Sequence, residues 1–343
     1  MKPLSKWTNA FMALTLATGL AACGNQASPD AGQTQAPANK GAELTELTIA
    51  LDWYPNAVHS FLYVAEEQGY FKDENLKVTM QMPSDSNDPL KMAAAGKVDL
   101  AISYQHQLIQ ARSEGVPVIS VGALVRHPLN VIMTRQDSGL DTPQKLAGKN
   151  IGYPSIPINE SIVRQVIKHV GADDSGLTFT DIGFDIVPAL TAKKVDAVVG
   201  GYINHELPIL EKHGVSVNVF KPSEFGVPDY YELVLATSDD TLGKKQQAME
   251  GFLRAIGKGQ DYVKNNKEKA LDLLLSKQAS EFPLEEDIET KSLDILIPLM
   301  DAGEKPFGYQ TTESWQTLID WMKKEKLITA DVKAEEIMRA LVK

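Results

Sequence analysis

Short apolar runs alternate with longer amphipathic runs along most of the chain. The first half contains apolar runs that we expect to form buried strands, at residues 47–51, 78–82, 98–102, 118–124 and 131–133. Two intervening segments, residues 57–68 and 89–95, have a helical pattern, and each is followed by a glycine, which commonly ends a helix. Strands that alternate with helices predict an α/β fold with a largely parallel sheet.

A second set of α/β units follows the first. The expected strands are residues 149–153, 195–199, 215–220 and 231–236, and the expected helices are residues 160–170, 186–192 and 203–213. From residue 241 onward the pattern is almost wholly helical, as in residues 249–263, 267–275 and 313–323. The chain therefore contains two successive α/β regions and a helical C-terminal region.

A weak internal repeat links the two α/β regions. The run KVDLAISY at residues 97–104 is similar to KVDAVVGGY at residues 194–202. The two copies are either ordinary α/β units or the matching parts of two lobes whose strands end at a shared cleft. Open α/β sheets bind ligands outside the carboxyl ends of their strands, so the second interpretation predicts a binding site there.

The N-terminal segment has the pattern of a secretory signal. Lys2 and Lys6 precede an uncharged apolar run at residues 10–22, which is too short for a permanent membrane-spanning helix. The run ends in LAACG, which resembles the lipobox of bacterial lipoproteins. We therefore expect residues 1–22 to be a signal peptide and residues 23–45 to be a flexible tether that is lipidated at Cys23. The alternative is a plain signal peptide with an incidental cysteine.

Composition narrows the possible functions. The 343 residues are 43% hydrophobic and suffice for about two domains, and the net charge of −11 argues against a nucleic-acid partner. Because Cys23 is the only cysteine, an internal disulfide, a CxxC redox pair and a multi-cysteine zinc site are excluded. The histidines lack metal-ligand spacing, and no GxSxG, HExxH or P-loop motif occurs. We therefore expect no catalytic residue, no metal and no cofactor.

Several motifs resemble the NMT1/THI5-like binding proteins. The most specific is DWYPNAVH at residues 52–59, which is followed by YVA and by GYFKDENLKV at residues 69–78; GKVD at residues 96–99 and LAGKNIGY at residues 146–153 also match. GYF and GKVD alone would indicate only the wider class of type II solute-binding proteins. Asn75 departs from the pattern, since the family commonly has glycine there, but asparagine tolerates a left-handed backbone. The resemblance extends from about residue 46 to about residue 330.

The resemblance implies a fold, a ligand and partners. The fold would be α/β, a two-lobe periplasmic-binding-protein-like (type II) fold with a hinged cleft, with residues 46–134 and 237–343 in lobe I and residues 135–236 in lobe II. Within the family, the motif D-W-x-x-N-x-x-H is most similar to proteins that bind a thiamine pyrimidine precursor, N-formyl-4-amino-5-aminomethyl-2-methylpyrimidine. Such a protein is lipid-anchored at the extracytoplasmic face of the cell membrane and delivers its ligand to the permease and ATPase of an ABC importer.

Five residues at the ends of expected strands and the starts of helices are candidate ligand contacts. Trp53 and Tyr202 each follow a strand of a different lobe, so their rings are expected to sandwich a flat heteroaromatic ligand, unless they are packing residues. Glu206 opens a helix and is expected to accept a hydrogen bond from the ligand 4-amino group, unless it only stabilises that helix end. Asn56 and His59 can share a helix face toward the ligand; the alternatives are an N-cap and a packing histidine.

Two further segments are expected to contribute to the site. Tyr104 begins a loop at residues 104–106 that follows a strand and should line the floor of the cleft. Residues 154–160 lead into a helix whose first N–H groups can hold an acceptor atom of the ligand. Gly200 and Gly201, which precede Tyr202, would let the main chain approach the ligand closely.

Other ligands and an enzymatic role are the alternatives. None of the six arginines lies in the expected cleft loops, which disfavours a sulfonate, a nitrate or a phosphorylated pyrimidine, whereas a riboflavin-like ring would stack equally well. Fungal pyrimidine synthases share the fold, and His59 falls where they have a histidine that they consume. Those enzymes also use a pyridoxal-phosphate lysine and a cysteine-rich segment, and the latter is absent from this chain.

Overall fold

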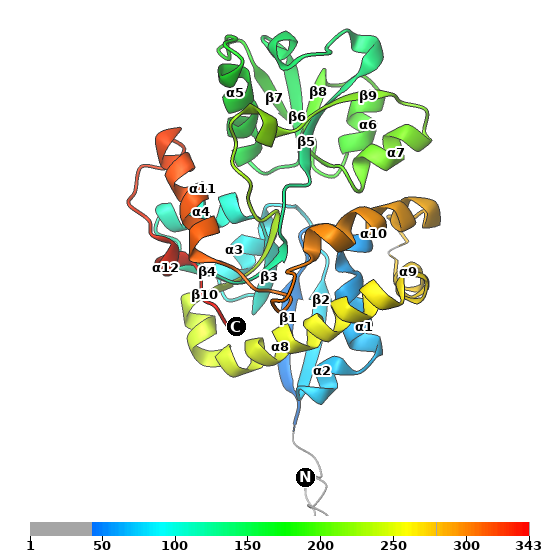
Figure 1. Cartoon of the computed structure of the whole chain (residues 1–343), viewed down its shortest axis with the longest axis vertical. Helices are drawn as coiled ribbons and strands as arrows, with labels where there is room; N and C mark the ends of the chain where they lie inside the picture. Colours follow the sequence, from blue (N-terminus) through cyan, green and yellow to red (C-terminus); the bar gives the residue numbers. More distant parts are fainter. Residues whose placement is uncertain (1–42, 279, 343) are drawn as a thin grey trace, which may run out of the picture. The chain divides into compact units, whose positions relative to one another are not determined.

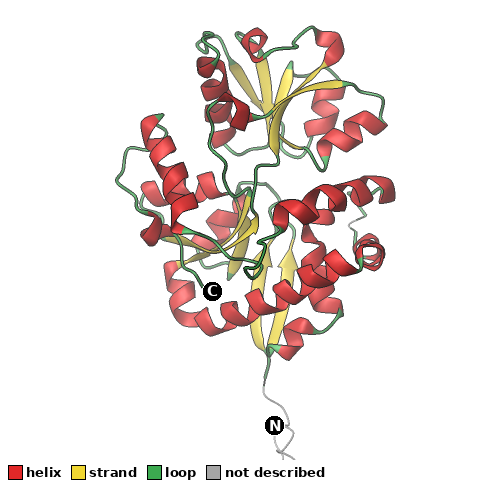
Figure 2. Ribbon diagram, viewed as in Figure 1, coloured by secondary structure: helices red, strands yellow, loops and turns green. Residues whose placement is uncertain are grey.

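The computed structural model describes residues 43–278 and 280–342. Within these residues, two five-stranded mixed sheets each carry their own helices (Figures 1 and 2). We call each sheet with its helices a lobe, and this arrangement confirms the expected two-lobe α/β fold. The expected signal peptide and Cys23 lie outside the described residues, and β1 begins at Thr45, which was expected to be the last residue of the tether.

Lobe I is built on the sheet with the strand order β2-β1-β3-β10-β4. Its strands are β1 (Thr45–Ala50), β2 (Leu76–Gln81), β3 (Leu100–Ser103), β4 (Val118–Val125) and β10 (Leu233–Ser238). Its helices are η1 (Ala57–His59), α1 (Ser60–Glu67), α2 (Tyr70–Asp73), α3 (Asp88–Ala94), α4 (Gln105–Ser113), α8 (Asp239–Asn265), α9 (Lys267–Ser276), α10 (Glu286–Met300), α11 (Thr312–Lys324) and α12 (Ala334–Ile337). β1 pairs in parallel with β2 and β3, and β10 runs antiparallel to both of its neighbours.

Lobe II repeats this plan with the strand order β7-β6-β8-β5-β9. Its strands are β5 (Asn130–Arg135), β6 (Asn150–Tyr153), β7 (Thr178–Asp181), β8 (Ala197–Tyr202) and β9 (Val217–Phe220), and its helices are α5 (Ile158–His169), α6 (Ile186–Thr191) and α7 (Glu206–Lys212). Here β6 pairs in parallel with β7 and β8, and β5 is the antiparallel strand. In each lobe, the antiparallel strand is the one that follows a crossing of the chain from the other lobe.

The internal repeat in the sequence corresponds to an equivalent contact in the two lobes. The main-chain N–H of Thr48 on β1 donates to Asp99 Oδ2 at 2.9 Å, and the N–H of Asn150 on β6 donates to Asp196 Oδ2 at 2.9 Å. Each aspartate thus ties the start of the third parallel strand to the first strand of its sheet. The residues at the far ends of those strands, Tyr104 and Tyr202, face the region between the lobes.

The chain crosses between the sheets earlier than the expected boundaries state. Residues 130–134 were expected in lobe I, but β5 pairs with β8 and β9 of lobe II. Residues 233–236 were expected in lobe II, but β10 pairs with β3 and β4 of lobe I. The reason is that a strand buried on both faces has the same largely apolar pattern in either sheet, and only its long-range hydrogen bonds decide which sheet it joins.

Each lobe inserts apolar side chains into the other. Trp53, from the loop after β1, packs in a lobe II cluster that includes Val131 and Ile186. In the opposite direction, Ile156 and Ile158 of lobe II belong to the main core cluster of lobe I. This reciprocal packing buries the ends of the parallel strands between the lobes. No helix within residues 43–278 and 280–342 combines the length and apolarity needed to cross a bilayer.

Candidate functional site

A pocket lies where the two lobes meet, and both lobes contribute to its lining. It encloses about 540 Å³ of space not filled by protein atoms, including the part open to solvent. The carboxyl ends of β1, β3 and β8 lead into the lining residues, as expected for ligand sites in α/β sheets. The pocket therefore lies where the internal repeat predicted a shared cleft.

The structure brings most of the expected site residues to this pocket. The lining includes Trp53, Asn56, Tyr104, Tyr202 and Glu206. The exception is His59, which is fully buried behind the pocket wall and is not among the lining residues. Whether the lining residues contact a ligand stays a prediction.

Asn56 and His59 have structural roles that the alternatives anticipated. Asn56 is the N-cap of η1, because its Oδ1 accepts from the Val58 N–H at 3.1 Å. His59 Nδ1 accepts from the Asn56 N–H at 3.3 Å, which assigns the ring proton to Nε2. That nitrogen donates to Asp52 Oδ1 at 3.0 Å, so His59 acts by orienting Asp52.

Asp52 is a site residue that the sequence analysis did not select. It is 2% exposed and lines the pocket next to Trp53. Its Oδ1 is held by His59, whereas no hydrogen bond to its Oδ2 is present within the described part of the chain. An acidic residue directly after the first strand was the signal available in the sequence, because that position lies at the carboxyl end of β1.

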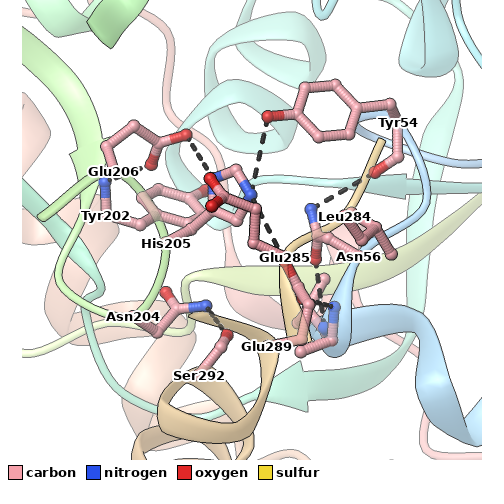
Figure 3. Close-up of polar contacts among 12 residues, drawn as sticks. Tyr54, Asn56, Tyr202, Asn204, His205, Glu206, Leu284, Glu285, Glu289 and Ser292 are labelled. Atoms are coloured by element: carbon pink, nitrogen blue, oxygen red, sulfur yellow. Dashed lines mark hydrogen bonds and ion pairs between the residues drawn. The ribbon is translucent and has the colours of Figure 1, made fainter. Parts of the chain in front are cut away.

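Both oxygens of the Glu206 carboxylate already have protein partners (Figure 3). Glu206 is the first residue of α7, and its Oε2 accepts from the Tyr202 N–H at 2.8 Å. Its Oε1 lies 2.7 Å from His205 Nδ1. The expected helix-end role and a place in the pocket wall therefore coexist, and any ligand donor must share an oxygen with one of these groups.

Glu232, at the start of β10, is a second carboxylate that was not selected from the sequence. Its Oε2 accepts from the N–H groups of Leu129 and Asn130 at 2.6 and 2.9 Å, and its Oε1 accepts from the Tyr202 hydroxyl at 3.2 Å. It thus joins the two segments where the chain crosses between lobes. Burial raises the pKa of this carboxyl to about 7, although the hydrogen bonds from Asn130, Leu129 and Tyr202 oppose the increase.

Within residues 43–278 and 280–342, three buried side-chain atoms have no hydrogen bond to the protein, and all three belong to residues of the pocket lining. They are Trp53 Nε1, His106 Nδ1 and Asn204 Oδ1. Burial lowers the pKa of His106 to about 3, so its ring is neutral at physiological pH. Because an unpaired buried polar group costs about 1–3 kcal/mol, their gathering in one pocket indicates a polar ligand that would pair with them.

One expectation about a main-chain segment is corrected, and the two glycines before Tyr202 have a packing role as well. Residues 105 and 106 begin helix α4 and are not part of a loop, so the His106 side chain projects from a helix start. Gly200 lines the pocket, and an added Cβ there would lie 2.5 Å from Pro154 Cδ, whereas an added Cβ at Gly201 would lie 2.3 Å from Met133 Cε. These glycines serve close packing within lobe II, and Gly200 also needs its φ of 88°.

The charge of the pocket wall is acidic. Asp52, Glu206 and Glu232 line it, and no lysine or arginine is among its lining residues. Trp53 supplies an aromatic wall and makes an edge contact with Phe184, with ring centroids 4.4 Å apart. No group of three or more metal-ligating side chains occurs in the part of the chain that the structure describes. This wall suits a neutral or cationic ring compound that carries hydrogen-bond donors.

Comparisons with known proteins agree with this fold and pocket. The family model "NMT1/THI5 like" matches residues 56–270. The formylaminopyrimidine-binding protein of Halalkalibacterium halodurans is 40% identical over 87% of this chain and 91% of that protein. A 4-amino-5-hydroxymethyl-2-methylpyrimidine phosphate synthase of Legionella pneumophila is 26% identical over 73% of this chain and 79% of that protein. The alkanesulfonate-binding protein of Xanthomonas axonopodis pv. citri, solved with MOPS bound, has a TM-score of 0.69 at 15% identity and covers 88% of this chain and 100% of that chain.

Proposed function

Because the chain belongs to the NMT1/THI5-like family, we propose that it is a solute-binding protein whose ligand is a formylaminopyrimidine precursor of thiamine. The ligand would be N-formyl-4-amino-5-aminomethyl-2-methylpyrimidine, a flat ring with an exocyclic amino donor and ring-nitrogen acceptors. The relative from Halalkalibacterium halodurans, which is named for such a ligand, supports this choice.

The observation that carries the proposal is the set of three unpaired buried atoms in an acidic pocket. Trp53 Nε1 is a donor, Asn204 Oδ1 is an acceptor, and neutral His106 Nδ1 can serve as either. An aminopyrimidine with a formylamino arm supplies both acceptors and N–H donors, so it can pair with all three. An anionic sulfonate or phosphate would instead face three acidic side chains, Asp52, Glu206 and Glu232, without a lysine or arginine in the lining.

We assign the recognition of the 4-amino group to Asp52 and not to Glu206. Asp52 Oδ2 needs no protein bond to be broken before it accepts from the ligand, whereas both Glu206 oxygens are engaged. Trp53 and Tyr202 remain the candidate stacking rings, and Tyr104 is also part of the lining. In this arrangement, His59 fixes the direction of the Asp52 carboxylate.

The cellular part of the proposal comes from the sequence. Cys23 would be acylated and would hold the protein at the extracytoplasmic face of the cell membrane. The tether would let the lobes capture ligand near an ABC importer, to whose permease they would release it. One solved structure with this fold, from Staphylococcus aureus, is named as the ligand-binding component of an ABC-type import system, which is in keeping with such a role.

The synthase alternative is less well supported by the pocket. His59 is fully buried, makes two hydrogen bonds within the protein and does not line the pocket. The lining also contains no lysine that could form a Schiff base. The relatives that are named as synthases are 25–27% identical to this chain, below the 40% of the binding protein.

Ligand identity is tested directly by mass spectrometry of the compound that purified protein retains. Isothermal titration of ligand-free protein with the formylaminopyrimidine, riboflavin and an alkanesulfonate then ranks the candidates. We expect tight binding of the formylaminopyrimidine and no measurable heat from the sulfonate. Stronger binding of riboflavin or of the sulfonate would refute the proposal.

A further inference from the structure

We propose that Glu289 on α10 is a positioning residue for the ligand pocket, which acts through His205 to hold the Glu206 carboxylate when the two lobes are closed. The inference deepens the proposed function and rests on it, because Glu206 matters here as part of a ligand site. Glu289 itself lies outside the residues that the family model matches, 56–270.

Side chains from both lobes form one buried chain of contacts (Figure 3). In lobe II, Glu206 Oε1 lies 2.7 Å from His205 Nδ1. The other ring nitrogen, His205 Nε2, lies 3.5 Å from the Tyr54 hydroxyl and 3.9 Å from Glu289 Oε1, both of lobe I. The imidazole of His205 therefore joins a carboxylate of one lobe to a carboxylate of the other.

Glu289 is held in place by the pocket wall of lobe I. Its Oε2 accepts from the Ala57 N–H at 2.7 Å, directly after Asn56. One turn along α10, Ser292 Oγ accepts from Asn204 Nδ2 at 2.9 Å, and Asn204 is a lining residue of lobe II. In Figure 1, α10 lies alongside α7, and it packs on both η1 and α7. α10 is thus a structural link between the two walls of the pocket.

The burial of these groups makes the protonation of His205 decisive. Glu289 is 1% exposed, His205 3% and Glu206 5%. Buried carboxylates are costly unless they are paired, and a protonated imidazole can donate toward both of them. Burial by itself lowers the pKa of His205, but its attraction and hydrogen bond to Glu206 and its attraction to Glu289 outweigh burial and raise it.

The same arrangement gives ligand binding a definite pH dependence. Because the pKa of His205 is raised in the closed pocket, the protonated ring stabilises that pocket. This stabilisation is complete at pH values below the ordinary pKa of an imidazole, and it is lost as the pH rises through the raised pKa of His205. Burial also raises the pKa of Glu289 and outweighs the opposing attraction of His205, so the ionisation of Glu289 likewise makes the pocket less stable as the pH rises. Tyr54 and His59 also face this cluster, and Tyr104 faces its Glu206. Affinity should therefore fall as the pH rises above neutrality.

The test compares Glu289→Gln with the matched control Glu286→Gln. The first keeps the size of the side chain and an acceptor for the Ala57 N–H but removes the charge, whereas Glu286 lies exposed on the same helix. Calorimetry with the formylaminopyrimidine at about pH 6 and about pH 8 measures affinity, and NMR titration of ligand-free protein measures the pKa of His205. We expect Glu289→Gln to bind about tenfold more weakly at the lower pH, to lose most of the pH dependence and to lower the pKa of His205, with the control unchanged.

A double variant distinguishes positioning from a merely structural role. If Glu289 acts through Glu206, then Glu206→Gln with Glu289→Gln should bind little more weakly than Glu206→Gln alone. Additive losses, or an unchanged pKa of His205 in Glu289→Gln, would overturn the proposal. If Glu289→Gln does not fold, His205→Gln removes the link from the other side and must abolish the same pH dependence. If the wild type does not bind the probe, the proposed function fails, while the titration of His205 still decides whether Glu289 controls its charge.

Discussion

Asp52→Asn is the substitution that most directly tests how the pocket recognises an aminopyrimidine. An asparagine has the same shape and keeps an oxygen to accept from His59 Nε2, which lies 3.0 Å from Asp52 Oδ1. Its NH₂ group then takes the place of Oδ2, which makes no hydrogen bond within residues 43–278 and 280–342. The change therefore turns a pocket-facing acceptor into a donor without breaking a bond within the protein.

The size of the effect follows from the hydrogen bond that is lost. A hydrogen bond to a charged group contributes about 1.5–3 kcal/mol, which corresponds to about a 10- to 150-fold loss of affinity for the 4-amino ligand. A 4-oxo analogue presents an acceptor, which faces the wild-type carboxylate unfavourably and the asparagine NH₂ favourably. We therefore expect the variant to bind the 4-oxo compound more tightly than the wild type does.

Calorimetry of both ligands with wild type, Asp52→Asn and Glu206→Gln is the assay. Glu206→Gln is the matched control, because the Tyr202 N–H and His205 Nδ1 already engage both oxygens of Glu206. Glu206→Gln should lower the affinity for both ligands, and the 4-amino compound should still bind more tightly than the 4-oxo compound. The reasoning is refuted if Asp52→Asn keeps the wild-type preference, and a reversal in Glu206→Gln alone would return the recognition of the amino group to Glu206.

Three other predictions concern stacking, pH and anchoring. Trp53→Phe keeps an aromatic ring but removes the unpaired Nε1–H donor, so calorimetry should show about three- to tenfold weaker ligand binding. Trp53→Ala also removes the stacking ring, so its affinity should be lower by a further factor of about ten. Equal affinities for the two variants would argue against the sandwich. The pKa of Glu232 is raised to about 7 in the folded protein, from the ordinary glutamate pKa of 4.5. The ionisation of Glu232 therefore destabilises the fold as the pH rises above 4.5. Urea unfolding should therefore show Glu232→Gln gaining stability relative to wild type between about pH 5 and about pH 8, by up to about 3 kcal/mol, and a constant difference would contradict this sign. If Cys23 carries the lipid, detergent phase separation should find wild type in the detergent phase and Cys23→Ser in the aqueous phase or uncleaved; wild type in the aqueous phase would exclude the anchor.

Much of the fold could be predicted because its signals are short-range. The strand-like runs expected at residues 47–51, 78–82 and 118–124 overlap β1, β2 and β4, since alternating or consecutive apolar residues are a signal within a few positions. Asn75 adopts the left-handed φ of 59° that its place in the family motif required. β7 was not anticipated, because its four residues are mostly polar and exposed and carry no apolar pattern.

The candidate site could be predicted only in part. Trp53, Tyr104 and Tyr202 were found because each follows a strand, and position along a strand is visible in the sequence. His59 was placed in the site by its spacing from Asn56, but its ring turns away to bind Asp52. Glu232 and Glu289 were missed because neither belongs to a motif and each becomes part of the site only through partners far away in the chain.

By itself, the sequence determined most of the succession of strands and helices, the family resemblance and the residues that stand at several strand ends, because each of these depends on periodicity or spacing within a few residues. The tertiary structure alone decided which sheet β5 and β10 join, which oxygen of Asp52 His59 holds, and that His205 meets Glu289. Those outcomes depend on hydrogen bonds and burial between segments that are distant in the sequence. Such contacts form only when the fold brings the two segments together, so local sequence patterns do not reveal them.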